Sequence, residues 1–352
     1  MTLLQIDWGL FLEKLILIAI IVFASLGVAL YSTYAERKIA AFMQDRIGPN
    51  RAGPFGILQP FADGLKLIFK EEIIPNPSSK ILFVLGPILA MTAALLTSAV
   101  IPWGNKLELF GRTINLQIAD VNVGVLYIFA IVSLGVYGIM IGGWASNNKF
   151  SLLSALRGAS QAISYELAMG ISLIALLMMT GSLSLKTIVE QQMAGKWGGL
   201  LGWNIWYQPL AFIIFLVCAF AECNRTPFDL SEAENELNMG YHQEYSSMKL
   251  GFYLFAEYVN MFISSAIIAT LFFGGYDVPF LNESTLSPNV AAIIGIISLM
   301  IKVIFFIFLF MWVRWTIPRF RYDQLMNLGW KKLLPLAILN MLITAVVILW
   351  RM

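Results

Sequence analysis

The sequence has few residues of the types that build disulfide frameworks and metal centres. Among its 352 residues are two cysteines, Cys218 and Cys223, and one histidine, His242. These side chains alone cannot form a disulfide framework or a four-ligand metal cage. The sequence also has no glycine-rich dinucleotide or nucleotide loop and no cysteine-rich cluster motif. Any electron chemistry must therefore come from partners, and we predict no metal site and no complete catalytic site on this chain.

Charged residues are also scarce. They make up 12% of the chain, against about 25% in ordinary soluble domains. The net charge is +2 and no basic run is present, which argues against a nucleic-acid partner. Hydrophobic residues reach 59%, enough for several membrane spans of about 20 apolar residues each. The sequence therefore predicts a protein embedded in a lipid bilayer.

Long stretches with few or no charges mark the expected spans. They are Leu15–Ala35, Ile81–Asn105, Val121–Asn148, Glu166–Leu185, Trp197–Ala221, Leu250–Tyr276, Asn289–Val313 and Leu333–Trp350. None shows the short alternating pattern of an outer-membrane β-barrel strand. We therefore predict an all-α integral membrane protein, a single polytopic domain over residues 1–352, with about eight transmembrane helices and amphipathic surface helices in its loops.

The distribution of lysine and arginine predicts the orientation. The odd-numbered loops carry 16 of these residues and the opposite side carries 5. By the positive-inside rule, the odd loops face the cytoplasm and both termini lie on the non-cytoplasmic side. Function is then expected on the cytoplasmic face, which holds the three long loops at roughly 36–80, 222–249 and 314–332.

The first loop combines a turn with an amphipathic helix. Residues 48–56 (GPNRAGPFG) favour turns, and Leu58, Phe61, Leu65 and Ile68 then recur at helical spacing. One interpretation is a surface anchor with a weak Asp63–Lys66 pair. The other is that this helix and the end of the first span frame a lipid-facing cavity. The polar groups near the head of an amphiphilic ligand would then be Glu36, Arg37, Arg46 and Asp63.

The loop after the fifth span is unusually acidic. Between residues 222 and 244 it has six acids and one base, Arg225. Thr226 and Pro227 favour a helix start, after which Asp229, Glu232 and Glu236 would share one helix face, with Glu234 off that face. A solvated acidic helix is one interpretation. A proton relay is the other.

Ionisable residues inside the expected spans favour the relay. Glu166 is expected near the start of the fourth span and Glu257 well inside the sixth, and buried carboxylates of this kind usually face a cavity, a partner or a proton path. A line from the loop through Glu222, Glu166 and Glu257 would suit proton transfer. His242 lies beside this line or on the surface. Lys302, inside the seventh span, is expected to pair with an acid or to have a functional role.

Several segments resemble the NuoH family of membrane subunits of respiratory complex I, the proton-translocating NADH:quinone oxidoreductase. They are residues 36–38 (ERK), 44–50 (QDRIGPN), 59–63 (QPFAD), 143–149 (GWASNNK), Arg157 with 164–167 (SYEL), 221–229 (AECNRTPFD) and 319–325 (RFRYDQL). The resemblance extends over nearly the whole chain. Energy-converting hydrogenases have related membrane subunits that share parts of the pattern, but the long match in the first loop favours the quinone-linked branch.

The resemblance implies a subunit that forms much of the quinone chamber. It implies that Glu36, Arg37, Arg46 and Asp63 lie near the quinone, which is ubiquinone or menaquinone. Flavin and iron–sulfur clusters would lie only on partner subunits of the membrane arm and the quinone-proximal peripheral arm. The location would be the bacterial cytoplasmic (inner) membrane, in contact with its lipid. The implied acidic funnel that couples quinone reduction to proton translocation comprises Glu166, Glu222, Asp229, Glu232, Glu234, Glu236 and Glu257.

An ion-coupled transporter that works alone is the rival from a different class. Intramembrane carboxylates and interrupted helices are also typical of such transporters. Internal two-fold symmetry in the hydropathy would favour this rival, and we find none in the sequence. The membrane subunit of an energy-converting hydrogenase is the nearer alternative.

Overall fold

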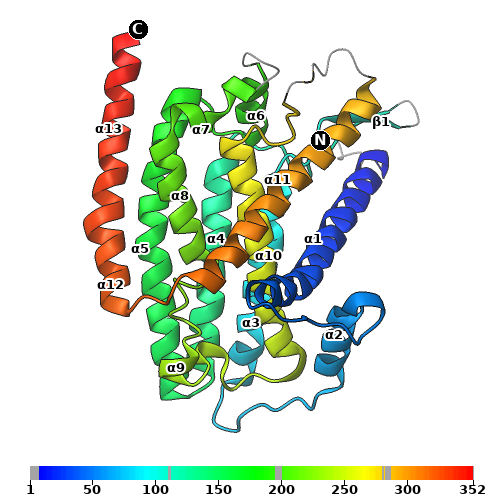
Figure 1. Ribbon diagram of the computed structural model, residues 1–352, viewed down its shortest axis with the longest axis vertical. Helices are drawn as coiled ribbons and strands as arrows, with labels where there is room; N and C mark the ends of the chain where they lie inside the picture. The colour runs from blue at the N-terminus through cyan, green and yellow to red at the C-terminus, as the bar shows by residue number, and fades with distance from the viewer. Residues whose placement is uncertain (1–7, 110–111, 195–199, 280, 282–286, 352) are drawn as a thin grey trace, which may run out of the picture.

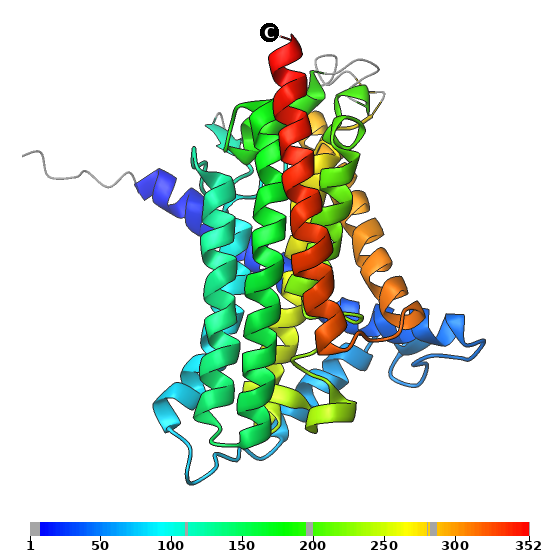
Figure 2. The ribbon, with the colours of Figure 1, turned by 90° about the vertical axis from the view of Figure 1, so that its left-hand side faces the viewer.

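The computed structural model describes residues 8–109, 112–194, 200–279, 281 and 287–351, and most of them form a bundle of helices (Figure 1). The long or central helices are α1 (Trp8–Met43), α3 (Lys80–Thr97), α4 (Gly124–Ala145), α5 (Lys149–Thr180), α8 (Pro209–Glu222), α10 (Ser247–Phe272), α11 (Pro288–Thr316) and α13 (Leu334–Arg351). In Figure 1, α1 and α11 are inclined to the other helices, and in Figure 2 α13 runs beside α5.

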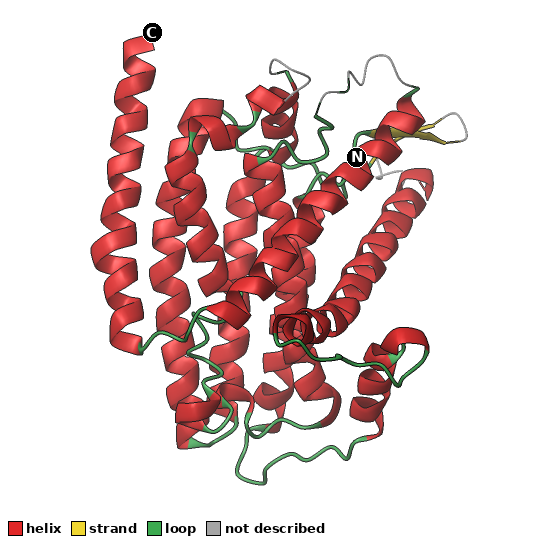
Figure 3. Cartoon of the chain, viewed as in Figure 1, coloured by secondary structure: helices red, strands yellow, loops and turns green. Residues whose placement is uncertain are grey.

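The shorter elements lie in the connections (Figure 3). They are α2 (Gln59–Phe69), α6 (Leu185–Met193), α7 (Asn204–Tyr207), α9 (Glu234–Leu237) and α12 (Tyr322–Asn327), 3₁₀ turns at Pro54–Gly56, Ser98–Val100, Leu200–Gly202 and Gly240–His242, a π-helical turn at Leu328–Leu333, and the strands β1 (Lys106–Leu109) and β2 (Arg112–Asn115). The two strands pair antiparallel, with Lys106 opposite Asn115. The prediction of an all-α membrane fold is confirmed.

Seven helices within the described residues are long and apolar enough to cross a membrane. They match seven of the eight predicted spans. The fifth predicted span, Trp197–Ala221, differs, because its helix α8 has only 14 residues and is preceded by the short α7. At about 1.5 Å per residue, α8 extends for about 21 Å, less than the thickness of a hydrocarbon core of about 30 Å. Pro209 begins α8, where its missing N–H costs no helical hydrogen bond.

The fourth span also differs from the prediction, since α5 begins at Lys149 and not near Glu166. Asn148 caps the helix by accepting a hydrogen bond from the backbone N–H of Phe150. The following serine, alanine and glycine residues carry α5 through the region that the hydropathy pattern had assigned to a loop. Glu166 therefore lies near the middle of a 32-residue helix.

The predicted surface helix of the first loop is present as α2, and its apolar side chains Phe61, Leu65, Ile68 and Phe69 are exposed. The predicted helix start at Thr226 is wrong. Residues 223–233 form turns, and a helix of only four residues, α9, follows. Contacts distant in sequence fix this loop, including a hydrogen bond from the Phe320 N–H to the Pro227 carbonyl. These contacts override the local helix preference.

Glycines allow α3 and α4 to pack closely around tyrosines from the loop and α10. The Tyr253 hydroxyl donates to the Gly138 carbonyl at 3.0 Å, and the Tyr245 hydroxyl donates to the Phe83 carbonyl at 3.0 Å. A Cβ added at Gly142 would lie 2.0 Å from the Tyr253 hydroxyl. Small residues commonly allow such close approach of membrane helices. The glycine at position 142 therefore makes room for Tyr253.

The Gly142→Ala variant is expected to lose about 1–3 kcal/mol of stability, because overpacking displaces Tyr253 or separates the helices. The measurement is the thermal unfolding midpoint of the protein in detergent. Gly170→Ala is the matched control, since a Cβ at Gly170 would meet no atom within 4 Å. An unchanged midpoint for Gly142→Ala would contradict the packing argument.

Candidate functional site

A cavity of about 790 Å³ lies where the end of α1 meets α2 and α10. Its polar wall includes Glu36, Arg37 and Asp63, and the Arg37 guanidinium forms an ion pair with Asp63 at 2.7 Å. Lys66 and Lys70 also line it, and leucine and aromatic side chains form much of the remaining wall, among them Leu254 and Phe255. The interpretation that α2 and the end of the first span frame a cavity is consistent with this geometry. The cavity is within the usual size range of small-molecule sites, about 300–1,000 Å³.

The structure brings together three of the four residues predicted to contact an amphiphilic ligand. Arg46 is the exception, since it does not line the cavity. It lies in the exposed turn after α1, where its Nε donates to the Gln44 side chain at 2.8 Å. The Asp63–Lys66 pair is long, at 3.9 Å, so it contributes little to the stability of α2.

A buried arginine connects this cavity to the interior. The Arg225 side chain is 1% exposed and forms ion pairs with Glu36 at 2.9 Å and with Glu257 at 2.8 Å. Its guanidinium lies over the ring of Tyr258, 4.1 Å from the centroid. Glu36 also accepts a hydrogen bond from the Tyr258 hydroxyl at 2.8 Å and pairs with Arg314 at 2.8 Å. Two arginines and two glutamates thus form one network of opposite charges, which is buried except at the partly exposed Arg314.

The fifth-loop acids do not share one helix face as predicted. Basic side chains from other elements hold two of them apart: Asp229 pairs with Arg319 at 2.8 Å, and Glu236 pairs with Arg157 at 2.7 Å. Residues 223–233 are not helical, so the spacing of three and four residues between Asp229, Glu232 and Glu236 does not place these acids on one face. Glu234 lies in α9, but its side chain is outside the described part of the structure.

Glu232 and His242 face each other inside the protein, with Oε1 and Nδ1 3.8 Å apart. Burial raises the pKa of Glu232 well above its usual range, and the nearby Glu257 and Asp229 raise it further. Arg225 and Arg319 act in the opposite direction. Burial lowers the pKa of His242 to about 4. Near neutral pH this environment therefore favours an uncharged imidazole beside a protonated carboxyl. His242 is buried, so the alternative of a surface histidine is wrong.

Three of the predicted relay carboxylates line one small internal cavity. The cavity, which we call the inner chamber, is lined by Glu222, Glu232 and Glu257. The space inside it that the centre of a water molecule can occupy is about 60 Å³. Glu166 on α5 does not line it. Glu166 accepts a hydrogen bond from Ser133 on α4 and is an electrostatic neighbour of Glu222. A row of ionisable side chains therefore runs from Glu36 through Arg225 and Glu257 to Glu222 and Glu166.

The sequence interpretation missed the basic and aromatic members of this arrangement, namely Arg225, Tyr258, Arg314 and Arg319. The signal available for Arg225 was its position as the one base in an acidic loop. No spacing rule connects it to Glu36, which lies 189 residues earlier. Tyr258 directly follows Glu257, but its position on the helix does not predict that its hydroxyl donates to Glu36, which is distant in the sequence.

Lys302 does not pair with Glu257. Its ammonium donates to the backbone carbonyls of Phe273, Gly275 and Asp277 at 2.7–2.9 Å, and it lies 4.8 Å from the centroid of the Trp203 ring. It thus holds the turn that follows α10. Carbonyl oxygens at a helix end are natural partners for a cation. The structural interpretation of Lys302 is favoured over a place in the relay.

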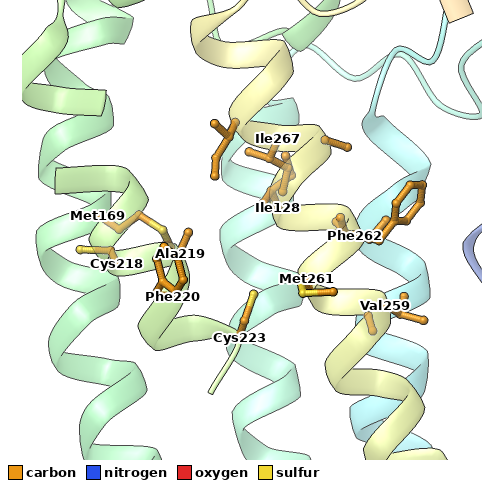
Figure 4. Packing of buried hydrophobic residues seen from close by; sticks show 14 of the residues in the cluster. Ile128, Met169, Cys218, Ala219, Phe220, Cys223, Val259, Met261, Phe262 and Ile267 are labelled. Carbon is orange, nitrogen blue, oxygen red and sulfur yellow. The ribbon is translucent and has the colours of Figure 1, made fainter. Parts of the chain in front are cut away.

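The two cysteines are free and buried. Figure 4 shows Cys218 and Cys223 among apolar side chains of α5, α8 and α10, including Met169 and Met261. Both cysteines thus pack as small apolar side chains. Within the described residues, no group of three or more His, Cys, Asp or Glu side chains is placed to hold a metal ion.

Comparison with known proteins identifies the family. The chain is 63% identical over 338 residues to an NADH-quinone oxidoreductase subunit of Cytophaga hutchinsonii, with 96% of this chain and 97% of the relative covered. It is 63% identical over 340 residues to a subunit of the same enzyme from Flavobacterium johnsoniae, with 96% and 95% covered. The corresponding protein of Thermomicrobium roseum, also named as an NADH-quinone oxidoreductase subunit, is 48% identical, with 98% of each chain covered.

A family described as NADH dehydrogenase matches residues 15–345. Neither the lone transporter nor the hydrogenase subunit is favoured by these similarities. The chain, a multi-pass membrane protein, belongs to the NADH dehydrogenase family.

Proposed function

We propose that this chain is the membrane subunit of a proton-translocating NADH:quinone oxidoreductase that forms much of the quinone chamber and couples quinone reduction to proton translocation. The relatives are named as subunits of that enzyme. The single observation that carries the coupling is the position of Arg225. It pairs at once with Glu36, on the wall of the large cavity, and with Glu257, on the wall of the inner chamber.

The large cavity has the chemistry that a quinone requires. Quinones have a polar headgroup and an apolar tail, and the cavity places Arg37 and Asp63 near Glu36, while leucine and aromatic side chains line much of the remaining wall. The Arg37 guanidinium can donate hydrogen bonds to quinone oxygens. The apolar face of α2 lies against membrane lipid in this proposal, at the level where a quinone would enter. Ubiquinone and menaquinone both fit this description.

Coupling follows from the shared arginine. Reduction of a quinone takes up protons together with electrons, so the charge near Glu36 changes during turnover. Arginine side chains remain charged in proteins. When the attraction between Arg225 and Glu36 weakens, the guanidinium therefore interacts more strongly with Glu257. Glu257 takes up a proton when Arg225 is drawn toward Glu36, and it releases that proton toward Glu222 and Glu166 when Arg225 returns to it. Asp229, Glu232, Glu234 and Glu236 belong to the same coupled set in the fifth loop.

The partners in this proposal supply the redox groups. Flavin and iron–sulfur clusters belong to other subunits, because this sequence has no motif for either. The fifth loop and the first loop face the peripheral arm, and the bundle contacts the other membrane-arm subunits. The excess of lysine and arginine on the odd loops supports a cytoplasmic position for these loops and a non-cytoplasmic position for both termini in a bacterial inner membrane.

The quinone assignment predicts the effect of filling the cavity. Leu254→Trp is expected to raise the KM for a short-chain quinone analogue about tenfold, because the larger ring occupies ligand space. The measurement is NADH:quinone reductase activity of the assembled enzyme in membranes. Phe252→Trp, at a half-exposed position of α10 that does not line the cavity, is the control. NADH oxidation by ferricyanide reports assembly. Normal quinone kinetics for Leu254→Trp would exclude this cavity as the quinone site.

The relay predicts that Glu222→Gln slows quinone reduction and proton translocation together. Glutamine retains the shape of the side chain but cannot carry a proton, and loss of an acid–base group of this kind costs about a hundredfold in rate. The measurements are NADH-driven acidification of inverted vesicles and quinone reductase activity. Glu190→Gln, an exposed glutamate on α6, is the control. If Glu222→Gln left both activities intact, the relay would have to be abandoned.

The shared arginine gives a separate prediction. Arg225→Lys keeps one positive charge but cannot bind two carboxylates with a planar fork, so it is expected to lower coupled turnover about tenfold while the enzyme still assembles. Arg319→Lys is the control, because Arg319 pairs with a single carboxylate at the edge of the network. Equal activities for the two variants would argue against Arg225 as the link.

A further inference from the structure

The turn that follows α10 is held by polar side chains that the proposed relay does not use. Gln192 of α6 donates to the Thr270 carbonyl at 3.0 Å, and Asn204 of α7 donates to the Leu271 carbonyl at 2.8 Å. Both carbonyls belong to the last turn of α10, where partners within the helix are lacking. Lys302 of α11 binds the carbonyls that come next. We call Gln192, Asn204 and Lys302 the cap cluster.

The ammonium of Lys302 is fully engaged in this turn. Gly274 and Gly275 have φ values of +73° and +57°, a left-handed conformation that favours glycine. The chain thereby turns three backbone carbonyls toward the ammonium, at 2.7–2.9 Å, and they belong to Phe273, Gly275 and Asp277. A lysine ammonium has three N–H donors. All of them are therefore used on groups that do not ionise.

The cap cluster lies at the end of the bundle where the fifth span is incomplete. α8 begins at Pro209 and extends for about 21 Å, so it does not reach across a hydrocarbon core of about 30 Å. α6 and α7 lie at the end of the bundle where α8 begins (Figure 1). Gln192 and Asn204 thus place buried polar groups where a full-length span would supply apolar ones. This end of the bundle therefore needs another means of resisting proton entry.

α10 joins the relay to the cap cluster. Glu257 and Ile267 of α10 line the inner chamber, and Leu271 lines a second cavity, of about 30 Å³, together with Glu222. The Leu271 carbonyl is the one that Asn204 binds. A proton that left Glu222 along α10 would therefore meet the cap cluster before it reached the end of the helix.

The chemistry of the cap cluster opposes the passage of a proton. A group that carries a proton must accept it and release it again. The amides of Gln192 and Asn204 do not ionise, and the ammonium of Lys302 has no acceptor. Its fixed positive charge also repels an incoming hydronium ion, as fixed cations do in selective pores. The Asp277 carboxylate accepts a hydrogen bond from the Trp203 indole at 3.0 Å and offsets the lysine charge at longer range, so the repulsion is local.

We propose that the cap cluster, with the Lys302 ammonium at its centre, is a proton barrier that separates the relay carboxylates from the non-cytoplasmic side. The proposal rests on the function and the orientation proposed above. It makes Lys302 an insulating residue, which keeps its three protons throughout turnover, so no bond to hydrogen forms or breaks there. Protons then do not run back through this end of the bundle without doing work.

The test removes the charge in the assembled enzyme. Lys302→Met keeps an unbranched side chain, but the three carbonyls then bind water, which conducts protons. In proteoliposomes, an imposed pH gradient is expected to decay about tenfold faster than with the wild-type enzyme, because the barrier is lowered. NADH-driven proton accumulation should fall while quinone reductase activity is retained. A fault in the quinone cavity or the relay would lower quinone reduction as well, so the split between the two activities identifies a leak.

Two controls separate charge from packing. Lys302→Arg keeps the positive charge and the N–H donors and should hold the gradient. Lys186→Met, at a lysine of α6 whose pair with Asp120 is long at 3.9 Å, should behave as wild type. Equal leakage from Lys302→Met and Lys302→Arg would overturn the role of the charge.

Asn204→Asp is a second test, and it decides the question if Lys302→Met fails to assemble. Aspartate has nearly the shape of asparagine but can carry a proton, so this variant is expected to leak although Lys302 is present. NADH oxidation by ferricyanide reports assembly. An assembled Lys302→Met or Asn204→Asp enzyme that holds the gradient as the wild type does would overturn the barrier. If Glu222→Gln is impaired in the same experiments, the relay stands without it.

Discussion

The pairing of Arg225 with Glu36 and Glu257 is the constraint around which the rest of the site is arranged. A guanidinium that is 1% exposed inside an apolar bundle must have counter-ions, because an unpaired buried charge is very costly. The carboxylates come from α1 and α10, and Arg225 comes from the turn after α8. The charge requirement therefore fixes the relative positions of three segments. The second arginine, Arg314 from α11, balances the remaining carboxylate charge on Glu36.

In the function that we propose, this arrangement would carry a change of charge at the membrane surface to the interior without a large movement. Glu36 belongs both to the wall of the large cavity and to the buried network. In surroundings of low dielectric constant, a change of charge at one member alters the proton affinity of the others over several ångströms. The Tyr258 ring, against which Arg225 lies, limits the guanidinium to small displacements between its two carboxylates. Coupling through shared counter-ions is therefore consistent with a closely packed core.

The parts of the structure that depend on local pattern could be predicted from the sequence. Hydropathy located the long helices, and the spacing of Phe61, Leu65 and Ile68 predicted α2 because its contacts with α1 and α10 do not oppose the local helix preference. The fifth loop could not be predicted in this way. Its helix signals at Thr226 and Pro227 were outweighed by contacts with residues near 320, which are almost a hundred positions away. Similarly, charge alone suggested an acidic partner for Lys302, and Asp277 does interact with it electrostatically, but the hydrogen bonds of its ammonium go to three backbone carbonyls of a turn.

The sequence of polar and apolar cavities bears on the direction of proton movement. A continuous column of water across the bundle would short-circuit the membrane, since protons would follow the potential without any link to quinone chemistry. The inner chamber is polar where the carboxylates lie, and a second cavity of about 30 Å³, which touches Glu222 and Ser264, is otherwise lined by apolar side chains. In the proposed relay, a proton on Glu222 would therefore have an apolar region on one side and an acidic neighbour, Glu166 on α5, on another. The Ser133 hydroxyl of α4 donates a hydrogen bond to the Glu166 carboxyl, so the relay that we propose would continue from Glu222 across the bundle toward α5.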